Sequence, residues 1–186
     1  MKKRTWLALV ASLVWIALGW GMGEAEAQQI AAGYRVSGGS TVIVLSDEQV
    51  APAFRDCITL GAQSAIVISA GFAELATREA VARQAELRLL ARQSGVRLCG
   101  PNCLGMANIA GMSWTTPSRR IAPEMQALDG AIGVVSQSGA TAYRPLLATA
   151  QDRRIGFRYL VGTGNEADLE SSDFMRYMLG DPAVKV

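Results

Sequence analysis

Apolar runs alternate with segments of helical periodicity from residue 41 to the C-terminus. Five short apolar runs are typical of strands buried on both faces: 41–45, 65–69, 96–99, 132–135 and 157–161. Segments with helical spacing or capping residues follow most of them: 48–60, 74–93, 140–151 (interrupted by Pro145) and 168–179. This order predicts an α/β fold, with parallel sheets and helices on both faces.

Loops rich in Gly, Ser or Asn follow three of these strands, after Ser69, Cys99 and Val135. In open α/β sheets, ligands bind in the crevice beyond the carboxyl ends of the strands. The pattern therefore indicates a binding site built from these three loops.

Each loop has two interpretations. The Gly100-Pro-Asn-Cys-Leu-Gly105 loop is either a simple turn or a backbone cradle beside an amide and a thiol. Ser136-Gln-Ser-Gly139 is either a capped helix start or a site for a carboxylate or phosphate. It is no nucleophile elbow, because the G-x-S-x-G pattern is absent. In the segment 162–168, Asp168 is interpreted as a helix N-cap, and Asn165 and Glu166 are within reach of a ligand.

Composition excludes several functions. The chain has 186 residues, a net charge of +2 and no histidine. No basic stripe with interleaved aromatics is present, so nucleic acid is not expected as a partner. Without histidine the chain has no His-based general base, His metal ligand or phosphohistidine. The three cysteines, Cys57, Cys99 and Cys103, fit reduced cytosolic thiols, and no metal site is expected from them.

The N-terminus has the pattern of a secretory signal. Basic residues 2–4 precede an apolar run from Trp6 to Trp20, and Ala25-Glu-Ala27 follows. The run is short for a bilayer span, so a membrane partner is not expected. Residues 1–27 are therefore a signal-like segment, and the polar, glycine-rich residues 28–40 are predicted to be a linker.

The motifs, in their residues and in their order along the chain, resemble those of the ADP-forming acyl-CoA synthetases. The residues that carry the resemblance are Ala65-Ile-Val-Ile-Ser-Ala-Gly-Phe-Ala-Glu74, Gly100-Pro-Asn-Cys-Leu-Gly105, Val134-Val-Ser-Gln-Ser-Gly-Ala140, Gly164-Asn-Glu-Ala-Asp168 and Asp181-Pro182. The resemblance implies the C-terminal part of a Rossmann-like CoA-binding domain over 41–110, and a linker over 111–129. It implies the N-terminal part of a succinyl-CoA-ligase-like flavodoxin domain over 130–186.

The resemblance also implies an activity and a site. Members of this family make acyl-CoA, ADP and phosphate from a carboxylic acid, CoA and ATP. Carried over by motif, Ser69, Ala70 and Gly71 would border the CoA site. Pro101, Asn102 and Cys103 would lie by the CoA thiol and the acyl group. The remaining three residues would bind the substrate carboxylate or acyl-phosphate: Ser136, Ser138 and Gly139.

Several features of the family pattern are missing from this chain. Its first forty residues hold no glycine-rich nucleotide unit, and it contains neither the phosphorylated histidine nor an ATP-grasp segment. No catalytic residue is therefore assigned, and ATP–Mg is expected only through a missing domain or an ATP-grasp partner subunit. The strand at 41–45 would have an exposed edge, so we expect an oligomer.

Three functions stay open at this point. The first is a part of a cytoplasmic synthetase acting on acetate or on an aryl acid such as ferulate. The second is a non-catalytic CoA-binding module or pseudoenzyme. The third is an exported protein, which only the segment from Trp6 to Trp20 supports. CoA and ATP are cytoplasmic substrates, and this favours a cytoplasmic location.

Overall fold

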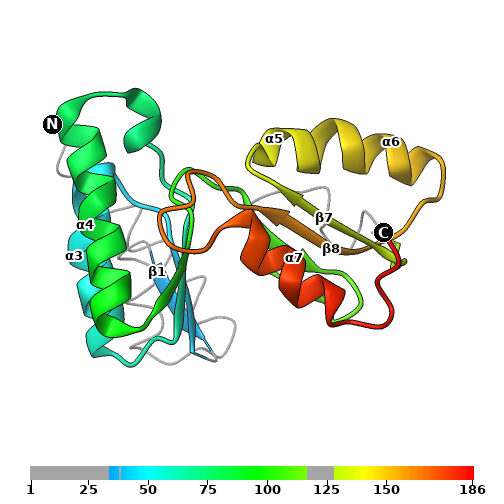
Figure 1. The fold of residues 1–186 in the computed structure, drawn as a ribbon, viewed down its shortest axis with the longest axis horizontal. Coiled ribbons are helices and arrows are strands. Elements are labelled where there is room, and N and C mark those ends of the chain that lie inside the picture. Colours follow the sequence, from blue (N-terminus) through cyan, green and yellow to red (C-terminus); the bar gives the residue numbers. More distant parts are fainter. Residues whose placement is uncertain (1–33, 38, 117–127) are drawn as a thin grey trace, which may run out of the picture.

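The computed structural model describes residues 34–37, 39–116 and 128–186. These residues form two four-stranded sheets that lie side by side, each with its own helices (Figure 1). The strand order is β1-β2-β3-β4 in the first sheet and β6-β5-β8-β7 in the second. The α/β fold is confirmed. The signal-like segment 1–27 lies outside the described residues.

The first sheet has a parallel centre. Its strands are β1 (Tyr34–Ser37), β2 (Ser40–Ile43), β3 (Ser64–Val67) and β4 (Arg97–Cys99). β2, β3 and β4 run parallel, as the alternation of strands and helices predicted. Their connections are α3 (Asp47–Thr59), the 3-10 turn η1 (Ala73–Leu75) and α4 (Arg78–Ser94). Both α-helices pack on one face through buried side chains that include Phe54 and Leu87.

The strand β1 was not predicted. Tyr34–Ser37 pairs antiparallel with β2, within the segment 28–40 that the sequence indicated as a linker. Ser37 pairs with Ser40, and Gly-Gly is a common dipeptide between two strands joined by a tight hairpin. The expectation that the strand at 41–45 has an exposed edge is therefore wrong. That edge no longer gives a reason to expect an oligomer.

The second sheet receives strands from both sides of position 110. Its strands are β5 (Gly105–Asn108), β6 (Ser113–Trp114), β7 (Ile132–Ser136) and β8 (Phe157–Gly162). β7 and β8 are parallel, whereas β5 runs antiparallel to β8. β5 and β6 were not predicted, and β5 joins this sheet although it precedes residue 110. The division of the chain into 41–110 and 130–186 remains a prediction.

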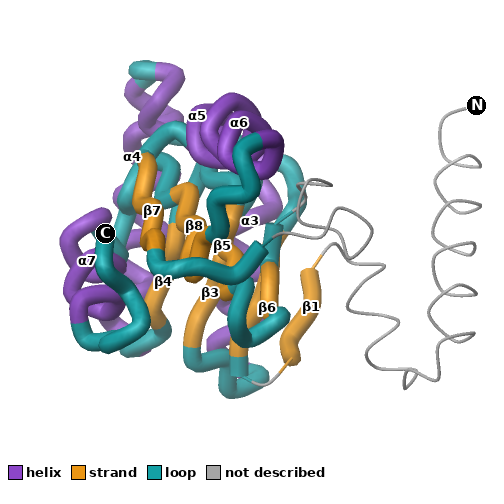
Figure 2. The backbone as a smooth tube through the Cα atoms, turned by 90° about the vertical axis from the view of Figure 1, so that its right-hand side faces the viewer, coloured by secondary structure: helices purple, strands orange, loops and turns teal. Residues whose placement is uncertain are grey.

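Helices cover both faces of the second sheet (Figures 1 and 2). On one face lie α5 (Gly139–Thr141), the π-helical turn η4 (Ala142–Leu146) and α6 (Leu147–Asp152). The other face carries α7 (Ser171–Leu179). The predicted interruption at Pro145 takes the form of this π-helical turn, because proline has no N–H to donate to the preceding turn. No helix in the described ranges is both long and apolar enough to cross a lipid bilayer.

Residues 163–169 bring the chain back from the second sheet to the first. The N–H of Ala167 donates to the Gly100 carbonyl at 2.9 Å, and that of Leu169 donates to the Leu98 carbonyl at 3.0 Å. These main-chain bonds place the segment beside β4 and the loop that follows it.

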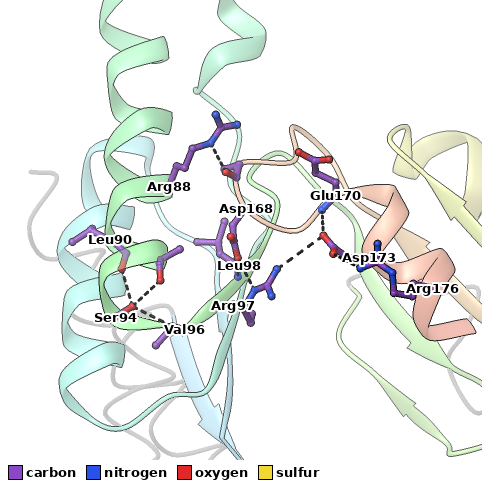
Figure 3. Close-up of polar contacts among 12 residues, drawn as sticks. Arg88, Leu90, Ser94, Val96, Arg97, Leu98, Asp168, Glu170, Asp173 and Arg176 are labelled. Carbon is purple, nitrogen blue, oxygen red and sulfur yellow. Dashed lines mark hydrogen bonds and ion pairs between the residues drawn. The ribbon is translucent and has the colours of Figure 1, made fainter. Parts of the chain in front are cut away.

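Side chains reinforce this junction (Figure 3). The guanidinium of Arg88 on α4 donates to the Ala167 carbonyl at 2.6 Å. The Asp168 carboxylate accepts from the Leu98 N–H at 3.0 Å and from the Arg97 guanidinium at 3.1 Å. The interpretation of Asp168 as a helix N-cap is therefore wrong. Glu170 caps α7 in a capping box with Asp173.

Candidate functional site

Loops at the carboxyl ends of four strands meet where the two sheets join. The Asn102 N–H donates to the Ser69 carbonyl at 2.8 Å, and the Asn165 N–H donates to the Pro101 carbonyl at 2.9 Å. A third main-chain bond links the Thr163 N–H to the Ser136 carbonyl at 2.9 Å. The loops after β3 and β4 thus touch directly. The loop after β7 is hydrogen-bonded to the segment after β8, and the sequence indicated only weakly that this segment belongs to the site.

The loop after β3 mixes a structural serine with open backbone. Ser69 is 8% exposed, and its hydroxyl oxygen accepts the Leu45 N–H at 2.9 Å. Ala70 is exposed. Gly71 has φ +107°, and a Cβ there would lie 2.8 Å from the Asp47 Cβ, so only glycine fits. Ser69 therefore shapes the loop, and Ala70 and Gly71 form its accessible surface.

The GPNCLG loop packs tightly against β3. A Cβ on Gly100 would come within 2.4 Å of the Val67 carbonyl oxygen. Pro101 is buried, whereas Asn102 is exposed with φ 54°. Cys103 is 3% exposed, and its thiol donates to the Val67 carbonyl at 3.2 Å. Of the three predicted residues in this loop, Asn102 alone presents its side chain to solvent.

The loop after β7 is both a capped helix start and a possible donor site. The Ser138 hydroxyl oxygen accepts the Thr141 N–H at 3.4 Å and the Thr141 hydroxyl at 2.9 Å. Since that oxygen already accepts twice, its own proton is left to donate outward. The Ser136 hydroxyl instead donates to the Ser138 carbonyl at 3.0 Å. Ser138 is therefore better placed than Ser136 to donate to an anion.

Gly139 connects this loop to the GPNCLG loop. Gly139 is buried, and a Cβ there would lie 2.6 Å from the Leu104 Cβ. Leu104 is the fifth residue of the GPNCLG loop, so the two predicted binding loops pack directly on each other. A side chain on Gly139 would push them apart.

The Glu166 carboxylate accepts hydrogen bonds from two loops of the candidate site. The sequence predicted only that Glu166 is within reach of a ligand. The carboxylate accepts hydrogen bonds from Gln137 at 3.1 Å, from the Thr163 hydroxyl at 2.8 Å and from the Ser171 hydroxyl. Partial burial acts to raise the pKa of Glu166. The hydrogen bonds from Ser171, Thr163 and Gln137 outweigh it, and the pKa lies below its ordinary value. The ionised carboxylate thus ties the loops after β7 and β8 together.

Asn165 links the segment after β8 to the helical segments of the first sheet. Its amide nitrogen donates to the Glu74 carboxylate and, at 2.9 Å, to the Gln84 side-chain oxygen. Partial burial acts to raise the pKa of Glu74, but the Asn165 amide and the Gly71 N–H hold it below its usual range. Sequence reasoning missed Glu74 and Gln84, because Gln84 lies 81 positions from its partner and carries no motif.

A cleft of about 990 Å³ opens on the face of the first sheet that turns away from α3 and α4. Its lining is mostly apolar and includes Val42, Ile66, Ile68, Cys99, Met106 and Phe174. Among the described residues that line it, none is one of the nine predicted site residues. The cleft also takes lining residues from β5, β8 and α7, so it lies between the two sheets. The candidate site is the cluster of loops at the strand ends.

Comparison with known proteins fits this arrangement. Residues 129–186 match the model of the succinyl-CoA ligase like flavodoxin domain. An ADP-forming acetate–CoA ligase from Archaeoglobus fulgidus is 37% identical over 145 residues, which cover 78% of this chain and 20% of that protein. A trans-feruloyl-CoA synthase from an unknown prokaryotic organism is 35% identical over 125 residues, which cover 65% of this chain and 17% of that protein.

A solved structure agrees with these matches. The dinucleotide-forming acetyl-coenzyme A synthetase 1 of Ca. Korarchaeum cryptofilum superimposes with a TM-score of 0.67 at 30% identity. The match covers 77% of this chain and 29% of that one.

The fold is thus the α/β fold of acetyl-CoA synthetase structures, of Rossmann and flavodoxin type. The chain belongs to the ADP-forming acyl-CoA synthetase family, some of whose members are alpha subunits. It spans about a fifth of the length of two curated acetate–CoA ligases that it matches, from Archaeoglobus fulgidus and Methanocaldococcus jannaschii.

Proposed function

We propose that this chain provides the CoA- and acyl-binding part of an ADP-forming acyl-CoA synthetase. The complete reaction converts a carboxylic acid, CoA and ATP into acyl-CoA, ADP and phosphate. The observation that carries the proposal is the direct packing of the GPNCLG loop on the Ser136–Gly139 loop, through Leu104 and Gly139. The site for the thiol and the site for the acyl group would then be adjacent.

The CoA side of the site fits the residues present. Ala70 is exposed, Gly71 gives the loop its left-handed turn, and Asn102 offers an exposed amide that donates and accepts hydrogen bonds. Ser69, Pro101 and Cys103 are buried and hold the loop shape. CoA, when bound, would supply the thiol that accepts the acyl group.

The acyl side would hold a carboxylate or an acyl-phosphate. The free hydroxyl proton of Ser138 would donate to it, Ser136 would fix the Ser138 carbonyl, and Gly139 would keep the loops close. Two relatives act on different acids, acetate and ferulate by their names. We propose a small aliphatic or aryl acid as the substrate.

ATP chemistry would come from elsewhere. The 186 residues contain no histidine, so the chain itself cannot carry a phosphohistidine. A further domain or an ATP-grasp partner subunit would bind ATP–Mg and deliver the phosphoryl group. Since CoA and ATP are cytoplasmic substrates, we propose a cytoplasmic location.

The second candidate is a CoA-binding module without catalysis, which the absence of histidine favours. The two candidates differ in the acyl site. A synthetase part must bind an acyl-phosphate as well as CoA, and a CoA-binding module need bind CoA only.

Calorimetric titration of the whole chain with CoA and, separately, with acetyl phosphate tests both. We expect both to bind, Asn102→Gly to weaken CoA binding about three- to tenfold, and Ser138→Ala to weaken acetyl phosphate binding by a similar factor. Glycine keeps the left-handed conformation of position 102 and removes only the amide.

Ser172→Ala, at an exposed position on α7, is the matched control and should change neither affinity. CoA binding without acetyl phosphate binding would select the non-catalytic module. No CoA binding at all would reject both candidates.

A further inference from the structure

Two of the three cysteines lie together beneath the candidate site. Cys99 ends β4, and Cys103 lies in the loop that follows. They are 1% and 3% exposed, and both pack in one cluster with Ile66. The Cys103 thiol donates a hydrogen bond to the Val67 carbonyl at 3.2 Å. The third cysteine, Cys57, packs elsewhere, between α3 and the first sheet.

The two thiols are unequal. Interaction with Cys99 lowers the pKa of Cys103, whereas interaction with Cys103, together with burial, raises the pKa of Cys99. Thiolate is the nucleophile in thiol–disulfide exchange. Cys103 is therefore the attacking thiol, and Cys99 is the neighbour that holds its proton until a later step.

Both cysteines are buried, so a ligand reaches their sulfurs only after a local opening. Cys99 lines the apolar cleft, and Cys103 follows the exposed Asn102 in the loop proposed to lie by the CoA thiol. A local movement of that loop, breaking the hydrogen bond to Val67, would open Cys103 to a disulfide held at the site.

We propose that Cys99 and Cys103 form a dithiol that reduces disulfides of CoA and becomes an intramolecular disulfide. The preference for CoA over other disulfides rests on the proposed function, and the dithiol chemistry does not.

The steps balance. The Cys103 thiolate attacks one sulfur of the CoA disulfide, the S–S bond breaks, and the leaving CoA thiolate takes up a proton. Cys99 then loses its proton and attacks the Cys103 sulfur, and the second CoA leaves as its thiol. Two protein thiols are oxidised to one disulfide, and one CoA disulfide is reduced to two CoA thiols.

Oxidation would also alter the site. A disulfide at Cys103 removes its hydrogen bond to Val67, and the same loop carries the Asn102 amide bonded to Asn165 at 3.2 Å. The oxidised chain would hold the GPNCLG loop in a different position and bind CoA more weakly. The dithiol would thus make the site sensitive to the redox state of the CoA pool.

The test exposes the whole reduced chain to CoA disulfide or to glutathione disulfide. Free thiols are then alkylated under denaturing conditions and counted by intact mass. We expect only Cys57 to be alkylated, with no adduct, and about tenfold faster closure with CoA disulfide than with glutathione disulfide. Cys99→Ser should stop at a CoA adduct on Cys103, whereas Cys57→Ser should close as the natural chain does.

Each other result has a defined meaning. Three alkylated cysteines with both oxidants, or a disulfide that includes Cys57, would overturn the dithiol. Equal closure rates with the two disulfides would support the dithiol and count against CoA binding at this loop. If Cys99→Ser does not fold, Cys103→Ser serves instead: the proposal requires that it form neither adduct nor disulfide.

Discussion

Asp181, near the C-terminus, accepts hydrogen bonds from Arg158 at 2.6 Å and from the Tyr159 hydroxyl at 2.7 Å. The hydrogen bond from Arg158 is the main reason that the pKa of Asp181 falls to about 2, from an ordinary value of 3.8. The hydrogen bond between Tyr159 and Asp181 is the main reason that the pKa of Tyr159 rises to about 12. These three side chains join β8 to the segment after α7.

A depressed carboxyl pKa predicts a defined acid sensitivity. The folded state holds Asp181 ionised more strongly than the unfolded state does, so its contribution to stability is complete above about pH 4. That contribution is lost as the pH falls toward 2. In Asp181→Asn we expect a lower thermal midpoint at pH 7 and a flatter decline below pH 4. Asp152→Asn, at an exposed position, is the control, and an acid limb in Asp181→Asn as steep as in the natural chain would contradict the prediction.

At the residue scale, the sequence indicated which loops lie together better than it indicated what each side chain contacts. The motifs selected Asn102 and Ser138, and both side chains are exposed at the candidate site. It could not show that the Ser69 oxygen is taken by the Leu45 N–H, because that bond joins residues 24 positions apart. The same holds for Glu74, whose partner Asn165 lies 91 positions away.

At the scale of elements, two glycines allow the cost of a left-handed backbone conformation to be separated from the cost of a steric clash. Gly164 has φ +67°, and a Cβ there would lie 2.3 Å from the Pro101 carbonyl oxygen. Gly61 has φ +81°, with nothing within 4 Å of the added atom. Gly61→Ala should cost about 1 kcal/mol of unfolding free energy, through strain alone. Gly164→Ala should cost about 1–3 kcal/mol more, because backbone must move. Denaturant titration of both variants measures the difference, and equal costs would show that the loops after β4 and β8 separate easily.

The Asp168 carboxylate offers a second test of the same junction. Its side chain is 14% exposed and satisfies the Leu98 N–H. Asp168→Ala should lower the unfolding free energy by about 1–3 kcal/mol, since a part-buried donor loses its partner. Asp168→Asn retains an acceptor oxygen and should recover much of that loss. If alanine and asparagine destabilise equally, the ion pair with the exposed Arg97 carries the effect instead.

Elements with strong periodicity were predictable, and weakly patterned ones were not. The spacing of Val50, Phe54 and Ile58 fixed α3 to within one residue at each end. β5 escaped prediction because Gly-Met-Ala-Asn has little strand preference and is held by β6 and β8. β1 escaped because four residues before a glycine pair look like a linker.

For the molecule as a whole, the two cores should unfold together. Leu87 is fully buried in the core between α4 and the first sheet. Leu87→Ala should cost about 2–5 kcal/mol. Because β5 and residues 163–169 connect the sheets, we expect the amides of β8 to lose protection from hydrogen exchange by the same free energy. Unchanged protection of β8 would show two independently unfolding units.

Between β6 and β7, the described parts of the chain show no clean partition of the molecule. A gene split at that point would give one polypeptide ending with β5 and β6 and another beginning ahead of β7. The first would carry two strands whose sheet partner β8 belongs to the second, and the second would carry the 163–169 segment that borders β4. The two polypeptides would therefore have to be synthesised together and would purify as one complex, so a subunit boundary at this position would create an obligate pair.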